Sequence, residues 1–409
     1  MPDNAIATPK TEANLRPARS AAALLEVFLT ALRLGLTSFG GPIAHLGYFQ
    51  REYVERKRWL DERTFADLVA LAQFLPGPAS SQTGIAIGMI RGGLAGGVLA
   101  WLGFTLPSAV ALALFASLVH GYDVTRAGWL HGLLIVAVAV IAQAVWNLAR
   151  KLAPDPLRAS LAFVAAIIVL LWPSAFGQVG IIVAGGLFGW AFLPKAEATH
   201  VEPLKLSFGR GAALLALTLF FGGLVLLPLV REWTGAPALA LFDSFYRVGS
   251  LVFGGGHVVL PLLQAEVVPP GWVTNAQFLA GYGAAQAVPG PLFTFSAYLG
   301  STIGGWSDAL LAVVAIFLPS FFLIVGALPF WSALRARPGF QAALAGINAV
   351  VVGLLLAALY HPVWTSTIHA PLDLALALVD FALLAFWKRP SWLVVIVSAV
   401  GGSLIAALG

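Results

Sequence analysis

The chain has 409 residues, of which 59% are hydrophobic and 10% are charged, and its mean hydropathy is +0.90. Globular domains do not reach this balance, so we expect an integral membrane protein whose spans, at about 20 apolar residues each, leave no room for a sizeable soluble domain. The chain contains no cysteine, which excludes disulfides, iron–sulfur clusters and thiolate metal sites, and its net charge of +5 belongs to membrane loops rather than to a nucleic-acid surface.

Polar residues dominate the start of the chain. Residues 1–20 lack the short apolar core and the cleavage site of a signal peptide and are predicted to form a cytoplasmic amino-terminal tail. Thirteen apolar segments follow, and they predict an all-α, polytopic membrane fold. In the first half, residues 21–193, they cover 21–49, 65–90, 94–119, 128–149, 157–172 and 174–193. A linker, residues 194–237, holds an extra segment at 212–230, and the second half, residues 238–409, has segments at 238–263, 278–303, 309–331, 341–360, 372–387 and 392–408.

A long phrase near the start of the first half recurs near the start of the second. Residues 33–41 read Arg33-Leu-Gly-Leu-Thr-Ser-Phe-Gly-Gly41, and residues 247–255 read Arg247-Val-Gly-Ser-Leu-Val-Phe-Gly-Gly255. Further landmarks keep their order and nearly constant spacing: Gln50 with Gln264, Glu52 with Glu266, Trp59 with Trp272, Pro76-Gly77-Pro78 with Pro289-Gly290-Pro291, and Pro107-Ser108 with Pro319-Ser320. A repeat this long in a membrane chain indicates two homologous transporter halves.

The number of segments between matching elements predicts the relative orientation of the halves. Seven segments separate them, and an odd number reverses the orientation, so we expect an inverted repeat. The distribution of Lys and Arg favours a cytoplasmic amino terminus, except that the basic run Arg51–Arg63 would then lie outside. Re-entrant hairpins turning at Gly40-Gly41-Pro42 and at Pro76-Gly77-Pro78 would return this run to the inside. The sequence leaves open whether these segments span or re-enter.

The repeated Gly-Gly and Pro-Gly-Pro elements predict broken helices. Proline lacks a backbone donor and glycine weakens a helix, so backbone amides are left bare at the breaks. The amide end of a half-helix attracts anions, and neighbouring hydroxyl and amide side chains add hydrogen-bond donors. The alternative is that each break only kinks a packed helix. The predicted anion-binding residues at the breaks are Gly40, Gly41, Pro42, Pro76, Gly77, Pro78, Ser80, Ser81 and Gln82 in the first half, and Gly254, Gly255, Pro289, Gly290, Pro291, Thr294 and Ser296 in the second.

Two arginines lie inside apolar segments just before the first breaks. An arginine there needs a partner, a cavity or a ligand, so Arg33 and Arg247 are predicted to balance the charge of a bound anion. The alternative for Arg247 is an ion pair with Asp243, four residues earlier, whereas Arg33 has no acidic neighbour at that spacing. Asp67 and His257 are candidate proton carriers, with a solvated carboxylate and a structural histidine as the alternatives.

Sequence signatures of enzymes are missing. The sequence shows no metal-ligand spacing, Walker loop or serine-hydrolase elbow. We therefore predict no metal, no cofactor and no enzymatic activity, and an ATP-driven pump is disfavoured.

Several longer runs of residues resemble those of a known protein family. The strings are Phe39-Gly-Gly-Pro42, Trp59-Leu-Asp-Glu62 and the run from Phe65 to Thr83, followed by Phe253-Gly-Gly-Gly-His257-Val-Val-Leu-Pro261, Gln286-Ala-Val-Pro-Gly-Pro291 and Tyr298-Leu-Gly-Ser-Thr-Ile-Gly304. The chain resembles the long, two-domain members of the CHR family of chromate transporters, from about Leu25 to its end. The resemblance implies a carrier of the bacterial inner membrane that exports chromate and confers resistance, with the proton-motive force as its usual proposed driver.

Together, the repeat and the resemblance predict a secondary active transporter that exports chromate by alternating access. A sulfate or broader oxyanion transporter is the alternative, followed by a membrane sensor that binds an anion without moving it. The expected partners are the oxyanion and the lipid bilayer, without nucleic acid, and a homodimer stays open.

Overall fold

The computed structural model describes residues 20–39, 41–119, 128–172, 175–194, 209–253, 258–331, 337–365 and 367–408. Throughout these residues the chain forms helices and no strand, which confirms the predicted all-α fold. Five of the described helices are long and apolar enough to cross a membrane, at residues 79–119, 128–152, 210–234, 306–330 and 338–361. The protein is therefore a multi-pass membrane protein.

Helices of the first half and of the linker are α1 (Ala21–Thr37), α2 (Gly41–Phe49), the π-helical η1 (Gln50–Arg56), α3 (Glu62–Phe74), α4 (Ala79–Val119), α5 (Gly128–Leu152), α6 (Pro156–Leu171), α7 (Ala175–Phe192) and α8 (Arg210–Thr234). The second half comprises α9 (Pro237–Leu251), α10 (Val259–Val267), α11 (Asn275–Ala287), η3 (Leu292–Thr294), α12 (Phe295–Gly304), α13 (Trp306–Ala327), η4 (Leu328–Phe330), α15 (Pro338–Ala358), η5 (Leu359–Trp364), α16 (Pro371–Ala385) and α17 (Ser391–Leu408). The breaks predicted at the Pro-Gly-Pro elements are present, because α3 ends before the first Pro-Gly-Pro and α11 before the second.

Helix α4 consists of two helices joined at a glycine. Gly93 has φ 64° and ψ −159°, and Gly305, between α12 and α13, has nearly the same angles, φ 81° and ψ −155°. These angles are open to glycine and strained for other residues. The first part of α4, residues 79–91, therefore corresponds to η3 and α12, and the second part, residues 94–119, corresponds to α13.

Each half begins with two hairpins. In the first hairpin, Lys57 at the end of η1 reaches back to Glu26 near the start of α1, with 2.8 Å between Nζ and Oε1. In the second hairpin of the second half, the hydroxyl of Tyr298 on α12 donates to the carbonyl of Gln277 on α11 at 2.9 Å. In these hairpins the chain turns at a break and then returns along itself.

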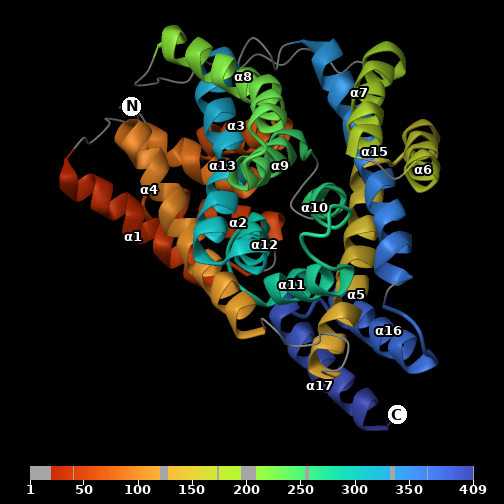
Figure 1. Cartoon of the computed structure of the whole chain (residues 1–409). Coiled ribbons are helices and arrows are strands. Elements are labelled where there is room, and N and C mark those ends of the chain that lie inside the picture. The colour runs from red at the N-terminus through yellow and green to blue at the C-terminus, as the bar shows by residue number, and fades with distance from the viewer. Residues whose placement is uncertain are drawn as a thin grey trace, which may run out of the picture.

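The ends of the two halves are exchanged. Helices α6 and α7 of the first half pack on α15 of the second, while α16 and α17 pack on α5 of the first, and these two groups are visible on the right of Figure 1. Glycines bring the helices close together: Gly346 of α15 lies against Gly185 of α7, and Gly132 of α5 lies against Ser398 of α17. Each half therefore completes the packing of the other.

Apolar side chains cover much of the outside. The outward face of α8 carries exposed Leu214, Leu219 and Leu226, and α6 exposes Phe163 and Ile167. Such faces need lipid in place of water, whereas the largest buried clusters lie around α9–α13 with α5 and around α1–α4.

Candidate functional site

The breaks of one half contact the breaks of the other. The backbone N–H of Gly77 donates to the carbonyl of Val252, just after α9, at 2.6 Å. Reciprocally, the N–H of Gly290 donates to the carbonyl of Ser38, just after α1, at 2.9 Å. Each Pro-Gly-Pro is thus held by the end of the first helix of the opposite half, and we call this region the crossing point.

Backbone geometry explains why Pro-Gly-Pro stands here. Gly77 has φ +123° and Gly290 has φ +104°, which side-chain-bearing residues rarely adopt. A Cβ added to Gly77 would lie 2.7 Å from the Oγ of Ser320, and one on Gly290 would lie 2.8 Å from the Oγ of Ser108. The repeated Pro-Ser pairs of α4 and α13 therefore also reach the crossing point, each serving the other half.

Hydroxyl groups follow each break in a matched pattern. Thr83 donates to the carbonyl of Ala79 at 2.8 Å and Thr294 to the carbonyl of Pro291 at 2.7 Å, so both are committed to their own backbone. The hydroxyls of Ser38, Ser81 and Ser296 are buried and have no hydrogen-bond partner among the described residues. A free donor therefore remains on each side of the crossing point, as an oxyanion site requires.

The first half contributes more polar groups than the second. Gln82 donates to the carbonyl of Pro76 at 2.6 Å, while its Oε1 accepts no hydrogen bond in the described part of the chain. The Oγ of Ser80 lies 3.2 Å from Nδ1 of His45, a buried histidine on α2. At the matching positions of the second half stand Phe293, Phe295 and Val259, so the site is not symmetric. His45 is not among the residues predicted from the sequence, and its position four residues after the Gly-Gly break is the signal that could have identified it.

Both arginines form ion pairs within their own half. Arg247 lies 3.1 Å from Asp243, as the alternative predicted, and 2.9 Å from Glu266. Arg33 has no acidic residue four positions earlier, but it lies 3.6 Å from Glu52, the residue that matches Glu266. The first hairpin brings this acid back to α1. Each arginine lies about 7.5 Å along its helix from the crossing-point residue five positions later.

The remaining predicted residues are placed only in part. Gly40, Gly254, Gly255 and His257 lie outside the described residues. Gly41 opens α2 with φ +79°, followed by Pro42 in its first turn. Pro78 and the Pro289–Pro291 turn flank the crossing-point glycines, and Asp67 lies half-buried on α3. The structure thus brings together the Pro-Gly-Pro elements and their hydroxyl residues and leaves Asp67 on a hairpin arm.

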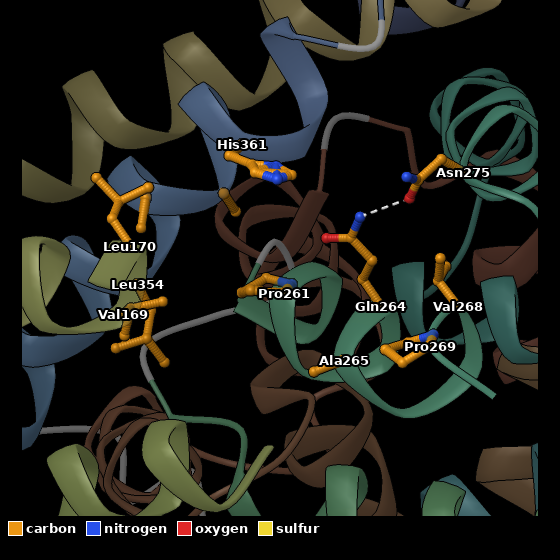
Figure 2. A pocket seen from close by; sticks show the side chains of 12 residues that line it. Val169, Leu170, Pro261, Gln264, Ala265, Val268, Pro269, Asn275, Leu354 and His361 are labelled. Carbon is orange, nitrogen blue, oxygen red and sulfur yellow. Dashed lines mark hydrogen bonds between the residues drawn. The ribbon is translucent and has the colours of Figure 1, made fainter. Parts of the chain in front are cut away.

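A pocket of about 290 Å³ lies away from the crossing point, at the base of the hairpins of the second half. Figure 2 shows the Nε2 of Gln264 donating to Oδ1 of Asn275, at 2.9 Å, on one side of it and His361 on another. Its wall is mainly apolar, with Pro261 and Leu354 among the lining residues. Gln50 and Glu62 form the matching contact in the first half at 3.2 Å, so this pair braces the base of each hairpin.

Comparisons with known proteins agree with this architecture. The sequence profile described as "Chromate transporter" matches residues 25–190 and again residues 239–403, once in each half. The "Chromate transport protein" of Pseudomonas aeruginosa is 29% identical over 92% of this chain and 90% of its own length. The "Probable chromate transport protein" of Synechococcus elongatus is 28% identical over 95% and 96%, and the "Chromate transport protein" of Cupriavidus metallidurans is 28% identical over 94% and 93%. No solved structure matches the chain. With both halves matched in order and the breaks paired across them, this chain belongs to the chromate transporter family.

Proposed function

We propose that this protein exports chromate, or a related oxyanion such as sulfate, across the bacterial inner membrane as a secondary active transporter and thereby confers chromate resistance. The observation that carries the proposal is the crossing point, where breaks from both halves bind each other and leave buried hydroxyl donors free. The names of the relatives support chromate as the substrate.

Helix directions support an inverted arrangement of the two halves. Leu24 lies against Gly92, and Gly35 lies against Phe104, so α1 runs parallel to the second part of α4 and starts at the same membrane face. Helices α6 and α7 are counted as a pair that leaves one membrane face and returns to it. The second part of α4, α5 and α8 then cross the membrane three times before α9 begins. The hairpins of the two halves accordingly enter from opposite faces, and their turns meet between the faces.

This topology supports a cytoplasmic amino terminus. The basic run Arg51–Arg63 returns to the face where α1 starts, since Lys57 and Arg91 both approach Glu26 there, at 2.8 and 3.7 Å. A cytoplasmic position for these cations follows the positive-inside rule. With this topology, the basic run Arg51–Arg63 agrees with a cytoplasmic amino terminus.

The substrate would bind between the halves. A tetrahedral dianion at the crossing point receives the first amides of α4, which have no partner within a helix, together with the hydroxyls of Ser38, Ser81 and Ser296. Arg33 and Arg247 contribute positive charge from one and a half turns away. The hydroxyl side chains of Ser38, Ser81 and Ser296 are buried, whereas Pro289 and Gly290 are partly exposed, and access to the site alternates when the two halves rock.

Charge and shape set what the site selects. Amides and hydroxyls recognise any tetrahedral oxyanion, which makes sulfate the second candidate substrate. Moving two negative charges out of a cell is favoured by about 4.6 kcal/mol per 100 mV of potential, negative inside, from twice the single-charge value. Export of the dianion therefore proceeds down the electrical gradient.

The test is uptake of radiolabelled chromate into everted membrane vesicles, with and without excess sulfate. The double variant Ser81→Ala and Ser296→Ala should lower the initial rate at least tenfold, because each hydrogen bond to a charged group contributes about 1.5–3 kcal/mol. Ser117→Ala is the control, since that hydroxyl only donates to Ala113 of its own helix. Equal rates in the double variant and the parent, with insertion confirmed by immunoblot, would exclude the hydroxyls from the site.

A further inference from the structure

One buried carboxyl takes no part in the crossing point. Asp380 lies on α16, within the apolar stretch Leu-Val-Asp-Phe-Ala, and none of its surface is exposed. Neither of its carboxyl oxygens accepts a hydrogen bond from any described residue. An ionised carboxylate in such surroundings is strongly disfavoured, and an intramembrane acid of this kind marks a functional position.

The side chain facing Asp380 suits the protonated acid. Ser398 of α17 approaches the carboxyl, but its hydroxyl already donates to the carbonyl of Gly132 on α5, at 2.9 Å. A serine hydroxyl carries one hydrogen, so Ser398 offers Asp380 only its oxygen lone pairs. A protonated carboxyl can donate a hydrogen bond to this oxygen, whereas a carboxylate cannot.

Charged groups on the neighbouring elements do not neutralise Asp380. Helix α16 packs on α5 and α17, and α17 has no charged residue. On α5, His131 lies 2.9 Å from Asp373, two turns before Asp380, and Arg150 and Lys151 lie at the far end of that helix. Lys388 and Arg389 follow α16, beyond its end. Among the described residues, His131 is already paired with Asp373, and the lysine and arginine side chains are remote. A proton is therefore the remaining way to neutralise Asp380.

The His131–Asp373 pair offers a route to this acid. The side chain of His131 is 22% exposed, while Asp373, on the same helix as Asp380, is buried. Residues seven apart on a helix share a face, so both acids of α16 point toward the same side. The pair and Asp380 thus form a polar line leading inward between α5, α16 and α17.

Packing connects this line to the crossing point. Leu133 of α5, two residues after His131, contacts Gly283 of α11, and α17 also packs on α11. Helix α11 leads directly into the second Pro-Gly-Pro turn. A change in how α16 and α17 pack on α5 therefore reaches the turn that contacts Ser38.

We propose that Asp380 is a proton-binding site and that its protonation and deprotonation couple proton entry to oxyanion export; the coupling, though not the proton site, rests on the proposed function. The corresponding helix of the first half, α6, lacks such an acid. Counted from the proline that begins each helix, the position on α6 that matches Asp380 is Ala165. One proton per transport cycle follows from this asymmetry.

Two measurements on purified protein and proteoliposomes test the proposal. Infrared difference spectra recorded across a pH titration should contain the carbonyl band of a protonated carboxylic acid in the parent, lose it in Asp380→Asn, and keep it, displaced, in Asp380→Glu. Asp155→Asn, a partly exposed helix-cap position, is the control that should leave the band unchanged. A band that persists in Asp380→Asn overturns the proton site, whatever the transport result.

Transport supplies the second readout. With one coupled proton, each unit of pH gradient should change the chromate accumulation ratio tenfold in the parent, and Asp380→Asn should retain voltage-driven uptake without this dependence. An unchanged pH dependence in Asp380→Asn overturns the coupling. If the parent shows the infrared band but moves no chromate under any gradient, the proposed function fails and the proton site stands.

Discussion

At the scale of single residues, the two halves use the same ion pair in different surroundings. Arg247 is mostly buried and contacts Asp243, whose side chain is 1% exposed, together with Glu266. Arg33 is 58% exposed and has Glu52 at 3.6 Å as its partner, which also pairs with Arg56. An exposed pair contributes little to stability, whereas a buried acid that loses its cation is strongly destabilising.

The two arginines should therefore respond differently to neutralisation. We expect Arg247→Gln to lower the free energy of unfolding by about 3 kcal/mol, the lower end for breaking a buried pair because Arg231 still contacts Asp243 at 3.2 Å. Arg33→Gln should cost less than about 1 kcal/mol. Unfolding by SDS in mixed micelles measures both. Adding Asp243→Asn to Arg247→Gln should recover part of the lost free energy of unfolding. Equal losses for Arg33→Gln and Arg247→Gln would contradict the conclusion that the Arg247 pair is buried and the Arg33 pair is exposed.

At the scale of helices, small residues hold the exchanged ends of the halves together. Gly346 of α15 and Gly185 of α7 are in direct backbone contact, and Gly353 of α15 meets Ala162 of α6 in the same way. Lipid chains are as apolar as the side chains, so the hydrophobic effect does not drive membrane helices together. Their association depends on close van der Waals packing of this kind.

Enlarging one of these glycines should separate the helices. A Cβ on Gly346 collides with the backbone of Gly185, so Gly346→Val is expected to destabilise the protein by about 1–3 kcal/mol. The matched control is Gly180→Val on α7, where an added Cβ meets nothing within 4 Å. Apparent melting temperature in detergent compares the two. If the melting temperature of Gly180→Val falls as much as that of Gly346→Val, the effect comes from placing valine in a helix and not from the contact between α15 and α7.

At the scale of the whole molecule, the proposed inverted repeat predicts that matching residues of the two halves lie on opposite membrane faces. The chain has no cysteine, so single-cysteine variants report one position each. Glu55→Cys, at the base of the first hairpin, should be labelled from the same face as Ser20→Cys. Pro270→Cys, at the corresponding base in the second half, should be labelled from the other face; all three positions are exposed. Labelling of Glu55→Cys and Pro270→Cys from one common face would rule out the inverted repeat.

Much of the fold was determined by the sequence. Composition and apolar segments established the helical membrane class, since a helix of about 20 apolar residues satisfies its own backbone in lipid. The repeat and the two Pro-Gly-Pro elements established homologous halves with broken helices, because proline and glycine act on the backbone locally. The serine and threonine residues near the crossing point could also be predicted, because they follow directly after each Pro-Gly-Pro in the sequence.

Only the tertiary structure decided which groups face one another. The crossing of Gly77 with Val252 and of Gly290 with Ser38 joins positions far apart in the chain. Glu52 reaches Arg33 because a hairpin folds back, and Asp380 is buried because α16 packs on α5 of the opposite half, with no hydrogen-bond partner among the described residues. Sequence periodicity describes one helix at a time, whereas ion pairing and burial depend on what a second helix brings to the same place.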